Sequence, residues 1–183
     1  IPSAPTPSDT NRWGQPKWMM SVTDLAFADG MVWIAGLSNE QFASSLRRVA
    51  YPFNSSSAQV ATLEVYHTSH DKFETESPVT SFLPITVNGR ASMIAGYGCA
   101  PVAIFDRATL DAQKHVKGRT VAELGGGNAP LDIVPYAKDG REYLLISNSD
   151  RTLMRFDRDS LLNAPTMTTS SFRSVPGISA IVL

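Results

Sequence analysis

Two segments of the chain repeat one pattern 51 residues apart: NGRASMIAGYGCAPVAIFDRATL (residues 88–110) and DGREYLLISNSDRTLMRFDRDSL (residues 139–161). Both begin with a turn dipeptide, pass through an apolar run and end in Phe-Asp-Arg and a leucine. A period of this size that is built from several short strands is typical of propeller blades rather than of solenoid turns. The matching positions are Gly89 and Gly140, Met93 and Leu144, Ile94 and Leu145, Phe105 and Phe156, Asp106 and Asp157, Arg107 and Arg158, and Leu110 and Leu161.

An earlier and looser copy lies at residues 21–53, SVTDLAFADGMVWIAGLSNEQFASSLRRVAYPF. Its extra length fits in a later loop that contains HTSHDKFETE (residues 67–76). The last residues, PGISAIVL (176–183), resemble the first strand of another copy. We expect each blade to consist of an inner strand, a hairpin, a second strand, a third strand that ends in Phe-Asp-Arg, and a variable outer strand.

Turn signals separate short runs rich in β-branched, aromatic and aliphatic residues. Asp29-Gly30, Asn88-Gly89 and Asp139-Gly140 are dipeptides that supply the positive φ angles of a tight hairpin. Helical periodicity is nearly absent, and only residues 41–48 and 108–113 predict short helical turns. In Phe-Asp-Arg we expect the phenylalanine to pack between blades and the aspartate and arginine to close the following turn.

The sequence therefore predicts an all-β protein, a β-propeller with about 3.5–4 blades of about 51 residues in this chain. Closed propellers need roughly four to eight blades, so we expect either a compact four-bladed ring or part of a larger propeller. The strand-like run that ends at Leu183 favours the second alternative. Residues 1–20 are interpreted as a linker or ring-closing segment, and residues 21–183 as blades.

Composition excludes several classes of function. Charged residues make up 18% of the chain and the formal net charge is −1, with no basic stripe, so nucleic acid is not expected as a partner. No apolar run approaches 18 residues, so no membrane span is predicted. Cys99 is the single cysteine, which excludes an internal disulfide and any CxxC motif.

The first residues, IPSAPTPSDT, look like a linker exposed by processing. We therefore expect export, to the periplasm or outside the cell.

Five segments together resemble a family of uncharacterised bacterial secreted β-propeller proteins, distantly similar to the quinoprotein and YVTN-type propellers. These segments are AGLSNEQFASSLR, VYHTSHDKFET, YGCAPVAIF, VKGRTVAELG and NAPLDIVPYAKDGREYLLISNS, and the resemblance extends from about Ser21 to Asp159. It implies the propeller fold and export, and it implies no reaction. Members of such a family are normally longer, which implies further blades.

The stretch EVYHTSHDKFETE (residues 64–76) contains the strongest candidate site. On a strand, His67 and His70 would lie on opposite faces and could not share a metal. Only a loop that curls back would bring these histidines together with Glu74, as zinc or copper requires. The alternative is a solvated loop held by local hydrogen bonds.

Cys99, in AGYGCAP, is the second candidate. It is either a soft metal ligand or redox thiol, or an inert thiol packed between strands.

Weaker candidates complete the search. Asp24 and Asp132 lie near the starts of inner strands, where acids either hold calcium or cap a turn. GGGN at residues 125–128 fits neither a dinucleotide fingerprint nor a P-loop and is interpreted as a linker between blades, after which Pro130 introduces a strand. His115 is interpreted as a surface residue. No Gly-x-Ser-x-Gly elbow occurs.

Two functions from different classes follow. The first is a binding module without catalysis, whose partner is another protein or the remaining blades; RWGQPKWMM would anchor it through Trp13, Trp18, Met19 and Met20, or would instead close the ring. The second is a metal-dependent oxidoreductase or electron-transfer protein that uses His67, His70, Glu74 and Cys99. A calcium-dependent hydrolase ranks third. Fold alone does not separate these functions.

Overall fold

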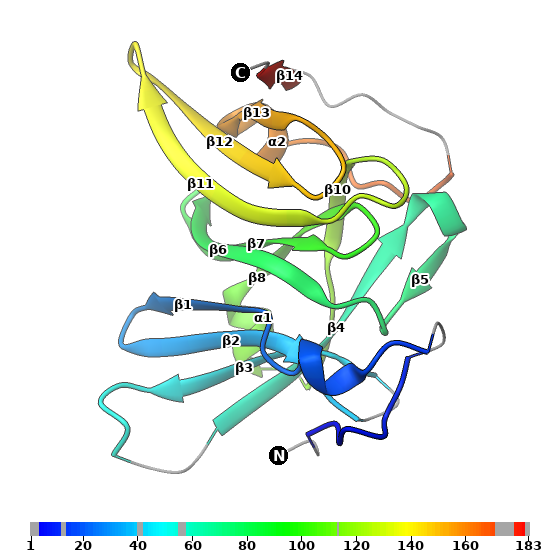
Figure 1. Ribbon diagram of the computed structural model, residues 1–183. Helices are drawn as coiled ribbons and strands as arrows, with labels where there is room; N and C mark the ends of the chain where they lie inside the picture. The colour runs from blue at the N-terminus through cyan, green and yellow to red at the C-terminus, as the bar shows by residue number, and fades with distance from the viewer. Residues whose placement is uncertain are drawn as a thin grey trace.

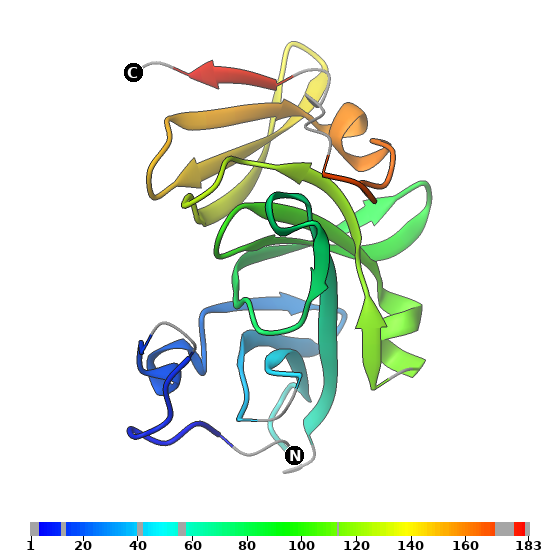
Figure 2. The same cartoon turned by 90° about the vertical axis from the view of Figure 1, so that its right-hand side faces the viewer.

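The computed structural model describes residues 4–11, 14–39, 42–54, 58–112, 114–170 and 178–181. These residues form three sheets of four to six mostly antiparallel strands, so the predicted all-β class is confirmed. Figures 1 and 2 show the sheets stacked one upon another, with the N-terminal sheet at the bottom and the C-terminal sheet at the top. No helix in the described ranges is long and apolar enough to cross a membrane.

The sheets follow one another along the chain. The first contains β1 (Asp24–Ala28), β2 (Met31–Leu37), β3 (Ser44–Ala50), β4 (Ala58–His67) and β5 (Lys72–Glu74), with β9 (His115–Lys117) parallel to β4. The second contains β6 (Val79–Val87), β7 (Arg90–Tyr97), β8 (Pro101–Asp106) and β10 (Arg119–Glu123). The third contains β11 (Pro130–Lys138), β12 (Arg141–Asn148), β13 (Leu153–Asp157) and β14 (Ile178–Ile181). The helices are η1 (Lys17–Met20), η2 (Thr68–His70), α1 (Arg107–Ala112) and α2 (Arg158–Leu162).

Each sheet begins with a tight hairpin at a predicted turn. The three turns join β1 to β2, β6 to β7 and β11 to β12. Both central residues of every turn have positive φ, as a two-residue hairpin with the right-handed strand twist requires. The φ values are 48° and 73° at Asp29-Gly30, 49° and 77° at Asn88-Gly89, and 51° and 72° at Asp139-Gly140.

The second and third sheets share one strand register. Met93 pairs with Phe105 across β7 and β8, and Leu144 pairs with Phe156 across β12 and β13. All four side chains are at most 1% exposed. The residues that match at a spacing of 51 in the sequence therefore occupy matching cross-strand positions.

The two Phe-Asp-Arg endings do more than close a turn. Asp106 accepts a hydrogen bond from the backbone N–H of Ala108 in α1, and Asp157 accepts one from that of Ser160 in α2, so each aspartate caps the turn that follows it, as predicted. The arginines instead reach back to the preceding sheet. Arg107 pairs with Asp29 in the β1–β2 turn, and Arg158 donates from Nη2 to the carbonyl oxygen of Thr86, 2.6 Å away beside the β6–β7 turn.

The sheets are joined along β1, β6 and β11, with β6 lying beside both others. Thr23 Oγ1 donates to the Val79 carbonyl oxygen over 2.5 Å, and Thr80 Oγ1 donates to the Pro130 carbonyl oxygen over 2.6 Å. A Cβ atom at Gly96 would lie 2.7 Å from Pro130, so glycine is needed where the second and third sheets meet.

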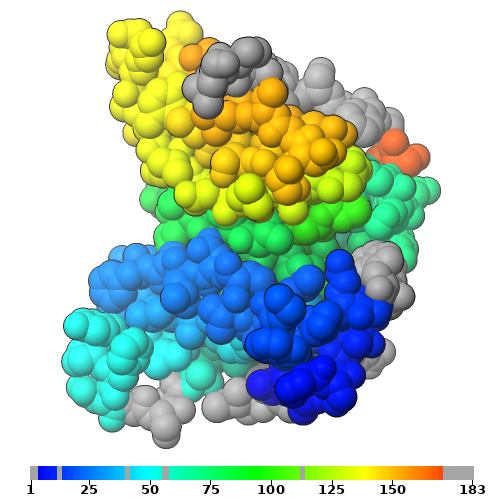
Figure 3. Space-filling model, in the orientation of Figure 1, coloured from blue at the N-terminus to red at the C-terminus, as the bar shows by residue number. Residues whose placement is uncertain are grey.

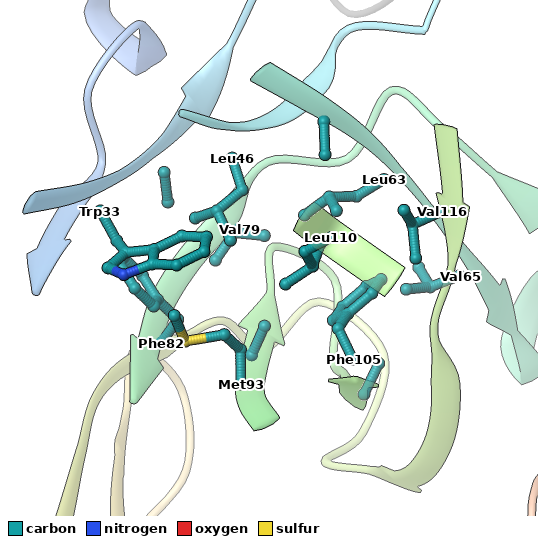
Figure 4. Packing of buried hydrophobic residues seen from close by; sticks show 14 of the residues in the cluster. Trp33, Leu46, Leu63, Val65, Val79, Phe82, Met93, Phe105, Leu110 and Val116 are labelled. Atoms are coloured by element: carbon teal, nitrogen blue, oxygen red, sulfur yellow. The ribbon is translucent and has the colours of Figure 1, made fainter. Parts of the chain in front are cut away.

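The hydrophobic core has two parts, one in each gap between sheets. Met93 faces the first gap and its neighbour Ile94 faces the second, because successive strand residues point to opposite faces. Figure 4 shows Trp33 and Leu46 of the first sheet packed toward Met93 of the second. The second sheet is thus covered on both faces.

Three sequence-based expectations are corrected or limited by the structure. The helical turn predicted at residues 41–48 is wrong where it can be assessed, because β3 begins at Ser44 and pairs with β2 and β4. The run PGISAIVL contains β14, which is the outer strand of the third sheet beside β13 and not the first strand of another copy. The described sheets form an open stack and do not close into a ring.

Candidate metal centre

The chain reverses direction where the sequence places its two histidines. Strand β4 ends at His67, η2 makes one tight turn, and Asp71 takes the left-handed conformation with φ of 50°. Strand β5 then runs back along β4. The hydroxyl of Tyr66 donates to Asp71, which braces this turn and raises the pKa of Tyr66 to about 12. The loop that curls back, the condition for a shared site, is therefore present.

Glu74 holds both histidine rings through their Nδ1 atoms. His67 Nδ1 lies 2.8 Å from Glu74 Oε2, and His70 Nδ1 lies 2.8 Å from Glu74 Oε1. The two ring centroids are 4.0 Å apart. Because one carboxylate occupies both Nδ1 positions, the Nε2 atoms are the ones left to coordinate a metal.

Glu123, at the end of β10, approaches the same histidine from the second sheet. His67 Nε2 lies 3.0 Å from Glu123 Oε1, but the ring N–H is not aligned for a hydrogen bond, so this is an ion contact. The carboxylate also accepts hydrogen bonds from the backbone N–H and hydroxyl groups of Thr68 and Ser69. Glu123 therefore fixes the turn that carries His70.

Mutual contacts keep this buried cluster charged. Burial alone would lower the pKa of His67, but its contacts with the carboxylates of Glu123 and Glu74 outweigh burial and raise this pKa to about 9. Burial also opposes ionisation of Glu123, yet the contacts with His67 and the turn lower its carboxyl pKa to about 2. The pKa of Glu74 falls well below its usual range, because its contacts with His67 and His70 overcome burial. At neutral pH an imidazolium lies between two carboxylates.

Cys99 joins the histidines from the loop between β7 and β8. One ligand atom from each of His67, His70 and Cys99 lies within 4.8 Å of the other two. Cys99 and Ala100 both have positive φ, 75° and 94°. Two such residues in succession, neither of them glycine, are uncommon and are found preferentially at functional sites.

The other candidates have separate environments. Asp24 accepts backbone hydrogen bonds from Leu25 and Phe82, and Asp132 accepts one from Ile133. Neither acid joins a cluster of three or more metal-binding side chains within the described part of the chain. The connection at residues 125–128 joins the second sheet to the third, and β11 begins at Pro130, as predicted.

The sequence suggested that His115 is a surface residue, but the structure places its ring in contact with Glu64 and Thr62. Its ring lies 2.8 Å from Glu64 Oε2 through Nε2 and 2.9 Å from Thr62 Oγ1 through Nδ1, and it is 34% exposed. The reason is β9, which pairs with β4 and places this histidine against the first sheet.

Sequence reasoning missed Glu123. It lies 53 residues after His70 and belongs to no local motif. A signal was present in TVAELG, where an acid stands between residues that form a buried strand. A buried carboxylate needs a partner, and that requirement could have connected it with a histidine.

This arrangement can do one of two things. The three charged groups can remain a buried ion-pair network that fastens the loop of residues 68–70 to the second sheet. Alternatively, His67 can give up its Nε2 proton and bind a metal together with His70 and the thiolate of Cys99. No protein-family model matches the chain, and a comparison with curated proteins finds no match. The choice therefore depends on the chemistry of the residues themselves.

Proposed function

We propose that the protein binds a transition-metal ion through His67, His70 and Cys99. The observation that carries the proposal is the convergence of one ligand atom from each of these residues within 4.8 Å, although Cys99 comes from a different sheet. Imidazole and thiolate together suit zinc and copper and are poor ligands for calcium or magnesium. A carboxylate that orients both imidazole rings is also in place, because Glu74 contacts the Nδ1 atoms of His67 and His70.

In this proposal the sheets are blades of an exported β-propeller. Support comes from the common register of the second and third sheets and from the adjacent strands β1, β6 and β11. The metal centre lies where β4, β7 and β10 end, and loops at strand ends are a usual location for functional residues. An oxidoreductase or electron-transfer role would use a redox-active metal at this centre.

Metal content tests the proposal directly. The protein is purified from its source without chelators, and metal per chain is measured by mass spectrometry under native conditions and by elemental analysis. We expect one ion per chain, reduced to trace levels in His70→Ala and Cys99→Ser. His115→Ala is the matched control, because that histidine also contacts a carboxylate but lies outside the cluster. Full retention of metal by His70→Ala and Cys99→Ser would contradict the proposal.

A second candidate function, an interaction module, is favoured by the outer face of the first sheet. Leu25, Phe27, Tyr51 and Phe53 are each more than half exposed. Tyr51 contacts both Phe27 and Phe53 edge to face, and these three residues line a hollow of about 290 Å³ with Val32. Apolar exposure on this scale is typical of a protein interface. The partner that fits best is a further β-sheet that continues the stack.

The N-terminal segment contributes to the same end of the molecule. Trp18 and Met19 are 49% and 66% exposed, and η1 lies against β2. Figure 3 shows this segment in dark blue beside the first sheet. Met20 is partly buried, and Trp13 lies outside the described residues. The segment lies against the end of β2 that is far from the β1–β2 turn, so Trp18 and Met19 form a separate exposed apolar site on the first sheet.

Assembly size tests the interaction module. Light scattering of the purified protein should give a mass above 19.8 kDa per particle, and Phe27→Ser with Tyr51→Ser should lower it to that value. Phe73→Ser, which changes an exposed aromatic residue on β5, is the control. A wild-type mass equal to one chain, with no change in the double variant, would exclude self-assembly through this face.

A further inference from the structure

We infer that the metal centre is a four-coordinate zinc site, that Glu123 is its fourth ligand, and that the ion fastens the first sheet to the second. This inference rests on the proposed metal-binding function. The ligands would be His67 and His70 from the end of β4 and the turn after it, Cys99 from the β7–β8 loop, and Glu123 from β10. Glu74 is then a positioning residue and not a ligand.

His67 Nε2 and Glu123 Oε1 are separated by only 3.0 Å. Zinc bonds of about 2.0–2.2 Å to nitrogen and oxygen, at a tetrahedral angle, place two such atoms about 3.4 Å apart. These atoms therefore already stand close to the edge length of a zinc tetrahedron. Replacing the Nε2 proton by the ion requires them to move apart by only a few tenths of an ångström.

Hydrogen bonds with the turn after β4 fix the orientation of the Glu123 carboxylate. Glu123 Oε2 accepts from the backbone N–H and hydroxyl of Thr68, and Oε1 accepts from those of Ser69. These bonds hold the carboxylate in one plane and leave Oε1 facing His67. Since the same turn carries His70, Glu123 also holds the backbone from which the His70 side chain extends.

The charges of the four side chains balance the charge of a divalent ion. A divalent ion with the thiolate of Cys99, the carboxylate of Glu123 and two neutral imidazoles gives an inner shell with no net charge. His67 and Glu123 are almost completely buried, and a neutral shell avoids the cost of an unpaired charge there. One sulfur, two nitrogens and one carboxylate oxygen in a tetrahedron suit zinc, whereas copper sites with two histidines and one cysteine take a weak, distant axial ligand in place of the carboxylate.

His70 and Cys99, the less constrained ligands, must move closer for an ion to be bound. Zinc bonds of about 2.0–2.1 Å to nitrogen and 2.3 Å to sulfur place these atoms about 3.5 Å apart in a tetrahedron, against the 4.8 Å limit observed for the cluster. Closing this gap among His67, His70 and Cys99 takes a movement of roughly 1 Å. Glu123 is not a member of that group, so His70 and Cys99 must also approach its carboxylate when the ion binds. His70 is about one third exposed and Cys99 is partly exposed in a loop, so both have room to move.

The consequence is a cross-link between sheets. β4 and β10 already touch, with Thr120 Oγ1 donating to the Tyr66 carbonyl oxygen over 2.7 Å. An ion shared by residues 67, 70, 99 and 123 would add a second connection a few residues away. Because such an ion binds only the folded arrangement, it stabilises the fold by mass action.

X-ray absorption spectroscopy of the zinc-loaded wild-type protein is the first test. We expect one sulfur at about 2.3 Å and three nitrogen or oxygen atoms at about 2.0–2.1 Å. This measurement needs no variant, so it decides the coordination number even where a substitution impairs folding. A shell without sulfur, or with two sulfurs from two chains, would overturn the inference.

Chelator competition with zinc then separates Glu123 from Glu74. Glu74→Gln should weaken zinc binding by about 10- to 100-fold, as expected for a partner that only orients ligands. Glu123→Gln should weaken it further, and Glu123→Asp should recover part of the loss because it keeps the charge. His115→Ala should leave the zinc affinity unchanged. Circular dichroism without metal checks that each variant is folded.

The outcomes distinguish this inference from the function on which it rests. If Glu123→Gln binds zinc as tightly as wild type while Cys99→Ser does not, the fourth ligand is water and only this inference fails. If wild type takes up copper and not zinc, the inference also fails while metal binding stands. If wild type binds neither ion, both fail and the cluster is an ion-pair network.

Discussion

The loops that leave β7 and β12 occupy the same place in the 51-residue register, yet they differ in chemistry. Cys99 in the first corresponds to Asp150 in the second. Cys99 is partly exposed and close to two histidines, whereas the Asp150 side chain is 71% exposed and contacts only its neighbour Arg151 among the ion pairs of the described residues. The strands on either side keep the same pairing. The comparison shows that the shared pattern specifies the sheets, while the loops are free to acquire a function.

The two gaps between sheets differ in the same way. At its loop end, the gap between the first and second sheets is closed by charges, with His67 between Glu74 and Glu123. Near the connection to the third sheet, the corresponding polar group is the neutral side chain of Asn128, which is fully buried and bonded to Asn148. A neutral amide network needs no charged partner. The charged network has a desolvation cost, which the contacts of His67 with Glu74 and Glu123 must offset.

The largest expected effect tests the strand register that the second and third sheets share. Phe105→Ala and Phe156→Ala should each lower the free energy of unfolding by about 3–5 kcal/mol, because each leaves a cavity at the same cross-strand position in its sheet. Urea denaturation of both variants measures the loss. A large effect at one position and less than about 1 kcal/mol at the other would show that the two sheets are not equivalent.

The next effect is the pH dependence of stability, and it is specific to the gap between the first and second sheets, which contains His67, Glu74 and Glu123. The pKa of His67 rises from 6.5 in the unfolded chain to about 9, so its stabilisation is complete below pH 6.5 and is lost as pH rises toward 9. For metal-free protein the loss should be on the order of 3 kcal/mol. On the acid side, the lowered pKa of Glu123 gives stability that is present above pH 4.5 and disappears toward pH 2.

Urea denaturation between pH 6 and 10, in the presence of chelator, measures the loss of stability at alkaline pH. His67→Gln should be less stable than wild type at pH 6 and should not lose stability between pH 6 and 10. His115→Gln should lose stability over this range as wild type does. If His67→Gln loses as much stability at alkaline pH as wild type does, another group is responsible for the loss.

The smallest effect concerns the arginines that link neighbouring sheets. Arg107→Ala and Arg158→Ala should each cost about 1 kcal/mol, because the acids that they contact are exposed to solvent. Arg107 also lies over the Trp33 ring, 5.4 Å from its centroid, so its loss should be the larger by a few tenths of a kcal/mol. Thermal unfolding of both variants gives the order, and a reversed order would contradict this reading of the Trp33 contact.

The sequence predicted what depends on local pattern. Hairpins at Asp29-Gly30, Asn88-Gly89 and Asp139-Gly140 follow from backbone geometry that those residues favour, and the structure has all three. The sequence grouped His67, His70, Glu74 and Cys99 as one candidate metal site from their residue types, and the structure brings these residues close together. Their convergence depends on how two sheets pack, and no local signal encodes that.

The errors have the same origin. The run at residues 41–48 has weak helical character, but pairing with β2 and β4 makes it a strand, because tertiary contacts override local preference. Glu123 could not be assigned to the site from its neighbours in sequence. Only the contact between β4 and β10 brings it to His67.

The most direct test of the metal centre is anomalous X-ray diffraction from zinc-soaked crystals of the whole chain, recorded on both sides of the zinc absorption edge. The account predicts one strong anomalous peak within bonding distance of His67 Nε2, His70 Nε2, Cys99 Sγ and Glu123 Oε1. It also predicts none at Asp150, which takes the place of Cys99 in the next sheet. An empty cluster at saturating zinc, or a single peak at His115 and Glu64, would contradict the account and leave the cluster as an ion-pair network.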